Sequence, residues 1–184
     1  MARVPYLTPD DADDSNRDVL ARGINLYFAL GNVPGAARAF STLGLWLRFE
    51  SKLDTRLREL AILTVGRIER AAYEWAHHVE LGFQFGVTEA DLTRLIAEVD
   101  DGKETDLEPL ARLVIRGAAE MALDGEMAQT TWDALSEHLD HKLMIELVAA
   151  VAFYCGLCRV LKTLKVDVEP EAQVFLDKWP LPKS

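Results

Sequence analysis

A carboxylate and an imidazole lie one helical turn apart in the middle of the chain, at Glu74 and His78. In the helix predicted from about Ala71 to Phe85, both belong to a stripe whose other members are apolar, so we expect that stripe to be half buried. A buried carboxylate is costly unless it is paired, and an imidazole four residues later is a natural partner. The two could form an acid/base couple in which His78 moves a proton and Glu74 orients it. Side chains that only satisfy each other, or that face a subunit interface, would show the same spacing.

The same predicted helix has a second, polar stripe, on which we expect His77 to lie at the surface or in an oligomer contact. The members of this stripe are Tyr73, His77, Glu80 and Gln84. A third stripe, which includes Trp75, is apolar and suited to packing.

Two cysteines, Cys155 and Cys158, have the spacing of a redox pair but fall inside an apolar helix predicted from His141 to about Lys165. Buried structural thiols and a displaced redox pair both fit this placement. The cysteines could also be combined with His138 and His141 into a zinc site. The histidines start the helix, however, and the cysteines follow about four turns or roughly 20 Å later, a distance that one zinc ion cannot span. We therefore expect no metal and no other cofactor.

The elements that position these residues are all predicted to be helices. Apolar residues repeat with a period of 3.6, and no stretch alternates as a half-buried strand would, which predicts an all-α protein. We expect a single domain over residues 1–184. Its core is a helical hairpin within 53–95, helices over 13–50 wrap over that core, and helices over 106–165 follow it.

Local signals predict where the helices begin and end. Asp54 can cap a helix that runs to Glu69, Gly86 can end the next helix, and Thr88 to Asp91 resembles a capping box. The first helical stretch is expected from about Asp13–Ser15 to Leu30. The chain is expected to leave helical geometry over 167–170, with a tail at 179–182.

Charge and composition exclude several kinds of partner. Acidic residues outnumber basic ones by 30 to 20, giving a formal net charge of -10, so we expect neither nucleic acid nor an anionic membrane as a partner. The most apolar run, Leu143 to Leu157, is shorter than the roughly 20 residues that a bilayer requires, and it contains Glu146. It is therefore predicted to be a buried helix. Two cysteines and an N-terminus without a signal-peptide pattern favour a cytoplasmic location.

Three motifs carry a family resemblance: Leu57-Arg58-Glu59-Leu60-Ala61-Ile62-Leu63, Tyr73-Glu74-Trp75-Ala76-His77-His78 and Gly86-Val87-Thr88. Together they resemble the core of the carboxymuconolactone decarboxylase family, which includes the alkylhydroperoxidase D-like proteins. The resemblance implies the multihelical alkylhydroperoxidase D-like fold and a homo-oligomer, a trimer or a hexamer. Aromatic residues in the N-terminal helices fit an oligomer contact, and core packing explains them about as well.

The peroxidase branch of that family carries a glutamate, then a Cys-x-x-Cys pair, then a histidine four residues after the second cysteine. Glu59 and His78 match the glutamate and the histidine, but Ala71 and Glu74 stand where the cysteines would be. A dithiol cycle at this position is therefore excluded. Members resembling the decarboxylase branch place a glutamate four residues before the histidine, as Glu74 and His78 do.

The resemblance implies cofactor-free acid/base chemistry, decarboxylation or a related reaction, on a small lactone or carboxylic acid. His78 would deliver the proton, Glu74 would hold it, and Glu59 could relay from the neighbouring helix. Residues expected to contact the substrate are Arg56, Arg67, Arg70, Tyr73 and Trp75, although the arginines could instead form ion pairs with Glu59 or Glu69. Two alternatives stay open: a peroxiredoxin-like antioxidant protein that uses Cys155 and Cys158, and a non-catalytic oligomeric binding protein.

Overall fold

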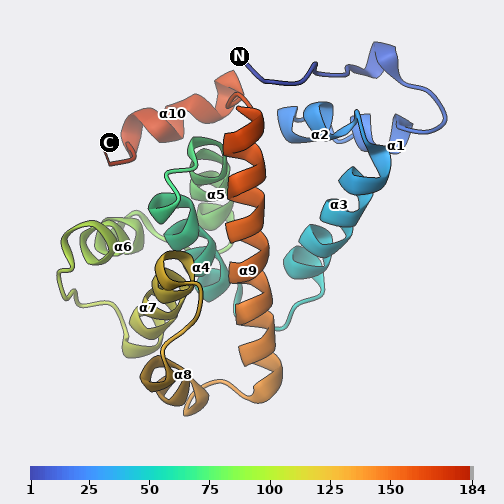
Figure 1. The fold of residues 1–184 in the computed structure, drawn as a ribbon. Helices are drawn as coiled ribbons and strands as arrows, with labels where there is room; N and C mark the ends of the chain where they lie inside the picture. Colours follow the sequence, from blue (N-terminus) through green and yellow to red (C-terminus); the bar gives the residue numbers. More distant parts are fainter. Residues whose placement is uncertain (183–184) are drawn as a thin grey trace.

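The computed structural model describes residues 1–182, and all regular secondary structure within them is helical, which confirms the all-α prediction (Figure 1). A 3-10 turn at Pro9–Asp11 precedes the first helix. The helices are α1 (Arg17–Leu20), α2 (Asn25–Leu30), α3 (Pro34–Phe49), α4 (Thr55–Ile68), α5 (Ala72–Gln84), α6 (Glu89–Asp101), α7 (Pro109–Asp124), α8 (Gln129–Ser136), α9 (His141–Leu164) and α10 (Pro170–Lys178).

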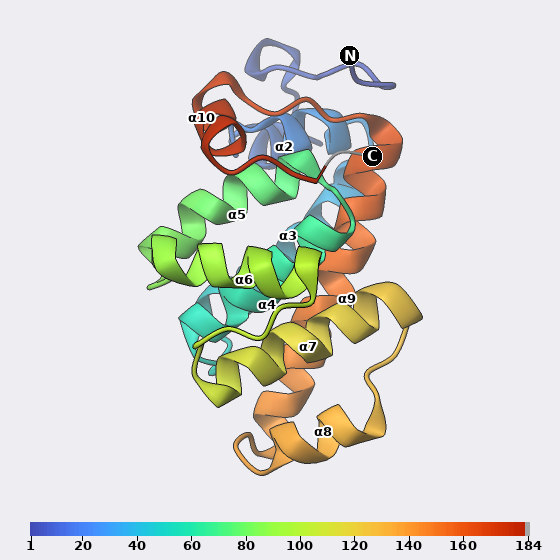
Figure 2. The same ribbon diagram turned by 90° about the vertical axis from the view of Figure 1, so that its left-hand side faces the viewer.

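Helix α4 lies at the centre of the fold, where it packs against α5, α7 and α9 (Figures 1 and 2). Eleven of its 14 residues are buried, including the charged Arg58 and Glu59. The side chain of Asp54 caps the helix by accepting a hydrogen bond from the backbone N–H of Leu57 at 3.0 Å. Because α4 is covered on several sides, the charged groups on it must find partners inside the protein.

Predicted signals at the ends of α5 and α6 are confirmed. Gly86 follows α5 with a φ of 98°, the left-handed conformation that a glycine adopts without strain. Thr88 and Asp91 form the capping box of α6, with each side chain accepting a hydrogen bond from the backbone N–H of the other residue. The sharp α4–α5 turn places Arg70 in the left-handed region at a φ of 51°.

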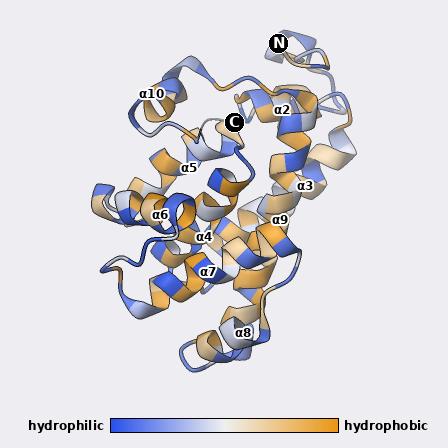
Figure 3. Ribbon diagram, turned by 60° about the vertical axis from the view of Figure 1, so that its left-hand side comes forward, coloured by the Kyte–Doolittle hydropathy of each residue, from blue (hydrophilic) through white to orange (hydrophobic). Residues whose placement is uncertain are grey.

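Helix α9 is the longest helix, and by length and hydropathy alone it could cross a membrane. Here it packs against α3, α4 and α7, and Met144, Leu147 and Ala150 are fully buried. The carboxylate of Glu146 accepts hydrogen bonds from the backbone N–H groups of Lys52, at 2.6 Å, and of Leu53 at the start of α4. Figure 3 shows hydrophobic residues throughout α9 and a hydrophilic loop between α6 and α7.

The two ends of the chain differ from the prediction. The single helix expected up to Leu30 is interrupted: α1 has four residues, and Gly23 at a φ of 73° separates it from α2. Helix α10 was not predicted. It begins at Pro170, because a proline is well suited to the first turn, where its missing N–H leaves no hydrogen bond unmade. This helix packs on α5.

Candidate active site

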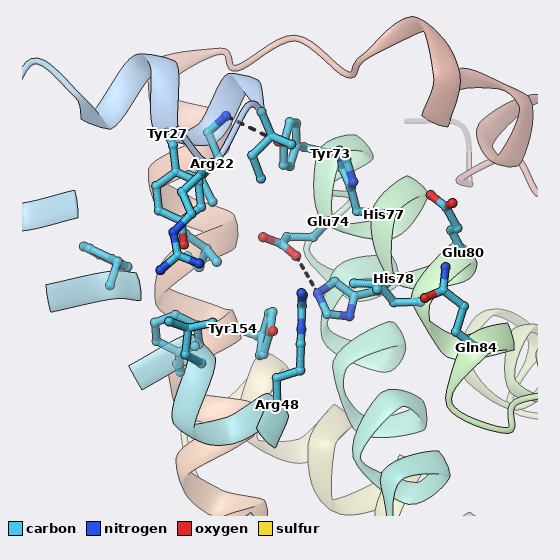
Figure 4. A pocket seen from close by; sticks show the side chains of 18 residues that line it. Arg22, Tyr27, Arg48, Tyr73, Glu74, His77, His78, Glu80, Gln84 and Tyr154 are labelled. Carbon is cyan, nitrogen blue, oxygen red and sulfur yellow. Dashed lines mark hydrogen bonds and ion pairs between the residues drawn. The ribbon is translucent and has the colours of Figure 1, made fainter. Parts of the chain in front are cut away.

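A cavity of about 360 Å³ lies beside α5 and is also lined by residues of α9 and the N-terminal helices (Figure 4). The α1–α2 connection and α2 contribute Arg22, Ile24, Leu26 and Tyr27; α3 contributes Phe40, Gly44, Leu45 and Arg48; α5 contributes Tyr73, Glu74, His77, His78, Glu80, Leu81 and Gln84; and α9 contributes Phe153, Tyr154 and Leu157. The N-terminal helices, which were expected to wrap over a core hairpin, thus form one wall of this cavity.

At the back of the cavity, four charged residues of α4 and α5 form a continuous buried chain. The guanidinium of Arg58 donates to Oε1 of Glu59, and Oε2 of Glu59 lies 2.7 Å from Nδ1 of His78. The other ring nitrogen of His78, Nε2, lies 3.2 Å from Oε2 of Glu74. The exposed fraction of all four side chains is 5% or less. The structure therefore brings Glu59, Glu74 and His78 together in one cluster.

Electrostatics favour the charged form of His78. Burial alone would lower the pKa of the imidazole, but the carboxylates of Glu59 and Glu74 outweigh it and raise the pKa to about 9. Burial also opposes ionisation of Glu59, yet His78 and Arg58 hold the pKa of that carboxyl below its usual range. At neutral pH the cluster thus holds the imidazolium of His78 beside the ionised carboxylate of Glu59.

The residues of this buried cluster differ in their access to the cavity. Glu74 and His78 line it, whereas Glu59 is behind His78 and does not. Figure 4 shows the carboxylate of Glu74 extending into the cavity, with the His78 ring bonded to it. Because both nitrogens of His78 already have carboxylate partners, a ligand in the cavity would meet the carboxylate of Glu74 first.

All four residues of the polar stripe of α5 line the cavity, and two of them, Glu80 and Gln84, are also exposed to solvent. His77 is 22% exposed, and its Nε2 lies 2.7 Å from Oε2 of Glu169. The hydroxyl of Tyr73 donates to the other oxygen of Glu169 at 2.9 Å, and so does the backbone N–H of Asn25 at 2.7 Å. Glu169, the residue before α10, thus ties α2 and α10 to the rim of the cavity.

The structure places four of the residues expected to contact the substrate, Arg56, Arg67, Arg70 and Trp75, outside the lining of this cavity. Arg56 pairs with Asp91 at 2.7 Å and also with Glu108, and Arg67 pairs with Asp100. Two of these carboxylates, Asp91 and Asp100, belong to α6, so Arg56 and Arg67 face α6. Arg70 is exposed at the α4–α5 turn.

The indole of Trp75 is fully buried under the guanidinium of Arg67, and its N–H donates to the carbonyl of Trp179 at 2.6 Å. The alternative partners predicted for the arginines were wrong. Glu59 pairs with Arg58, and Glu69 pairs with Arg159 and Lys162.

The sequence interpretation missed the two arginines that do line the cavity, Arg22 and Arg48. They lie in segments that were treated as a covering layer. The signal that could have found them is the concentration of aromatic residues in the same segments, because Tyr27 and Phe40 line the cavity as well.

The two cysteines are free, and both are buried on α9. Burial raises the pKa of both thiols, which is the opposite of what a reactive thiolate needs. His138 and His141 are exposed between α8 and α9. Within residues 1–182, no group of three or more His, Cys, Asp or Glu side chains is arranged to hold a metal ion.

This multihelical fold is that of the AhpD-like proteins. An AhpD-core, peroxidase-related protein from Ralstonia eutropha JMP134 superimposes with a TM-score of 0.77 at 19% identity, covering 95% of both chains. The debrominase Bmp8 does so with a TM-score of 0.78 at 17% identity, covering 96% of this chain and 97% of its own. A putative antioxidant defence protein from Agrobacterium tumefaciens gives 0.67 at 15% identity, covering 76% and 94%.

The family resemblance is also confirmed. Residues 34–116, which contain α4, α5 and the Glu59–His78–Glu74 cluster, match the carboxymuconolactone decarboxylase family. No protein of curated function matches the sequence.

Proposed function

We propose that this protein is a cofactor-free acid/base enzyme that decarboxylates, or otherwise protonates at carbon, a small lactone or carboxylic acid. The observation that carries the proposal is the buried chain Glu59–His78–Glu74, which ends at a carboxylate in a cavity. The match of residues 34–116 to the carboxymuconolactone decarboxylase family supports the same reaction class.

The geometry suggests roles that differ from those expected from the sequence. When the substrate carboxylate leaves as CO₂, the electron pair of the broken C–C bond is delocalised into the unsaturated ring, and one proton must be added at carbon. Nε2 of the His78 imidazolium would pass its proton to the carboxyl group of Glu74 as that group, which faces the cavity, protonates the carbon. Each turnover consumes one proton, which solvent restores through the cavity. Glu59 stays ionised and keeps His78 charged.

Arg58 completes this arrangement without touching the substrate. Its guanidinium donates to Oε1 of Glu59 from two nitrogens, at 3.1 and 3.3 Å, so that Oε2 is directed at His78. A buried carboxylate held in this way keeps its charge, because the positive partner offsets the cost of desolvation. Arg58 is therefore a positioning residue.

The thiol alternative gains no support from the site. Cys158 is fully buried and Cys155 nearly so, and a thiolate would be disfavoured in both. We retain the homo-oligomer as a proposal. Exposed apolar side chains on two long helices favour it, since Phe49 of α3 is 69% exposed and Ile145 of α9 is 65% exposed.

The proposal can be tested by measuring CO₂ release from a panel of unsaturated lactone carboxylic acids. We expect turnover by the wild-type protein and a loss of about 100-fold or more in Glu74→Gln, which keeps the shape of the side chain but cannot carry the proton. A matched control is Glu137→Gln at the exposed end of α8, which should leave turnover unchanged. If folded Glu74→Gln and the wild-type protein turn over the panel equally, the proposal is wrong. If the wild-type protein binds these acids without turnover, the non-catalytic alternative holds.

A further inference from the structure

Arg22 and Arg48 differ from the arginines deeper in the fold in the partners they have. Arg56, Arg58 and Arg67 each pair with at least one carboxylate. Within residues 1–182, no carboxylate forms an ion pair with Arg22 or Arg48, although both line the cavity. Two positive charges therefore face the cavity without a negative partner from the described part of the chain.

The guanidinium group of Arg22 is nevertheless held in place by its neighbours. Arg22 donates from Nη2 to the hydroxyl of Ser41 at 2.9 Å, and its guanidinium lies 5.6 Å from the centre of the Tyr27 ring. Figure 4 shows Arg22 reaching into the cavity from the N-terminal segment and Arg48 rising beside Tyr154. Arg48 is only partly exposed, so its charge would be attracted strongly to an anion that enters.

Arg58 connects Arg48 to the proposed proton path. From Nη1 it donates to the backbone carbonyls of Leu47, at 3.0 Å, and Arg48, at 3.3 Å, while it also holds Glu59. One buried guanidinium thus fixes both the end of α3 and the Glu59–His78–Glu74 chain. The backbone of Arg48 is therefore positioned by the same buried guanidinium that holds Glu59.

Part of the cavity wall is formed by aromatic side chains of α3 and α9. The Phe153 ring centre lies 5.9 Å from that of Phe40 and 5.1 Å from that of Tyr154, and Tyr154 in turn meets His78 edge-on at 4.8 Å. These rings are tilted or edge-on to one another, so an unsaturated ring that enters the cavity can stack on one of them and meet the next edge to face. With a volume of about 360 Å³, the cavity is near the lower end of the usual range for small-molecule sites.

We propose that Arg48, assisted by Arg22, forms a carboxylate-binding subsite, and that the ligand is a small planar ring carboxylate whose ring lies against Phe40, Phe153 and Tyr154. This subsite deepens the proposed function, because it holds a part of the ligand that does not react while the reacting carbon faces Glu74. Binding energy from a remote anionic group can then position the reacting atoms.

Binding of two probes to the full chain tests this subsite independently of turnover. Benzoate has the planar ring and the charge, and benzamide has nearly the same shape without the charge. We expect calorimetry to show benzoate binding at least about tenfold more tightly than benzamide, as charge-assisted hydrogen bonds predict. Arg48→Gln should abolish that preference, and Arg22→Gln should reduce it less because Arg22 is more exposed. Arg116→Gln, which removes an exposed charge on α7, should leave it unchanged.

Several outcomes would overturn the subsite. One is equal affinity of the wild-type protein for benzoate and benzamide. Another is an Arg48→Gln variant that unfolds more easily but keeps the preference, because Arg48 would then only stabilise the end of α3. If Arg48→Gln does not fold, Arg48→Lys and the decrease of benzoate affinity with added salt decide the same question. Turnover without a benzoate preference would refute the subsite alone, and a preference without turnover would refute the proposed function alone.

Discussion

Two neighbouring histidines on α5, His77 and His78, each form a hydrogen bond with a glutamate. The two resulting clusters differ in their burial and in the number of carboxylates around the imidazole. In both, a ring nitrogen lies 2.7 Å from a carboxylate oxygen. His78 is 5% exposed and has a second carboxylate, Glu74, on its other nitrogen, whereas His77 is 22% exposed and bonds only to Glu169. The partner of His78 comes from α4, the central helix, and the partner of His77 comes from the start of α10.

The difference shows that the surroundings of a histidine–glutamate pair decide its role more than the pair itself does. Successive helical residues point about 100° apart, so His78 is directed into the interior and His77 toward the rim. In the interior the carboxylates raise the pKa of His78 to about 9. At the rim, Glu169 also accepts hydrogen bonds from Tyr73 and from the backbone of Asn25, so this cluster joins three helices. We expect chemistry from the buried cluster and mechanical support from the rim cluster.

The largest difference between the buried cluster and the rim cluster should appear in turnover. His78→Gln removes the group that supplies protons to Glu74 and should reduce kcat by about 10² to 10⁴-fold, the usual contribution of general acid catalysis. His77→Gln should reduce kcat less than about tenfold, because His77 lies outside the chain from Glu59 to Glu74. CO₂ release by both variants, with helicity checked by circular dichroism, measures this contrast. Equal losses in the two variants would contradict the division of roles.

The next largest difference between the two clusters should appear in their contributions to the free energy of unfolding. Glu59→Gln leaves Arg58 and His78 buried with too little negative charge, so we expect the free energy of unfolding to fall by about 3–5 kcal/mol. Glu169→Gln keeps an acceptor for Tyr73 and Asn25 at a partly exposed site and should cost about 1 kcal/mol. Urea denaturation at pH 7 gives both values. A larger loss in Glu169→Gln would show that the rim cluster, and not the buried one, holds the fold together.

The pH dependence of stability should report His78 specifically. Its pKa is raised from the ordinary 6.5 to about 9, so its contribution is complete below pH 6.5 and is lost as the pH rises toward 9. The loss corresponds to about 3 kcal/mol over that window. His77→Gln should keep this decline, and His78→Gln should remove it. Urea midpoints at pH 6, 7.5 and 9 decide the matter, and an unchanged slope in His78→Gln would contradict the charged state assigned to the cluster.

The smallest effect is expected from the thiols that lie near the buried cluster. Cys158→Ala removes a side chain whose thiol pKa is raised by burial, so turnover should change less than about twofold. In the native wild-type protein, both cysteines should react slowly with a thiol reagent until urea is added. Fast reaction of two thiols in the native state, or loss of turnover in Cys158→Ala, would assign a redox step to the buried region.

Local signals predicted the helices of the central part of the chain. Asp54, Gly86 and the Thr88–Asp91 box act within one turn of themselves, so the sequence around them is sufficient. The ends of the chain could not be predicted in this way. Helix α10 depends on packing against α5, and the break between α1 and α2 depends on Gly23 adopting a left-handed conformation.

For the candidate site too, some residues could be predicted from the sequence and others could not. The pairing of Glu74 with His78 follows from a spacing of four residues on one helix, and the addition of Glu59 followed from the family resemblance. The arginines did not follow from either. Arg56 and Arg67 were expected at the substrate because they are close to Glu59 in sequence, but both face carboxylates of α6.

The sequence by itself determined the all-α class, the family and the Glu74–His78 pair, because helical periodicity, capping and short motifs act over a few residues. Only the tertiary structure decided that α2, α3 and α9 close a cavity around that pair and that Arg22 and Arg48 face it. It also decided that both ring nitrogens of His78 have carboxylate partners, so that a ligand in the cavity would meet the carboxylate of Glu74 first. The physical reason is that burial and charge partners are set by helices brought together from distant parts of the chain, and no spacing along one helix encodes which neighbour will cover it.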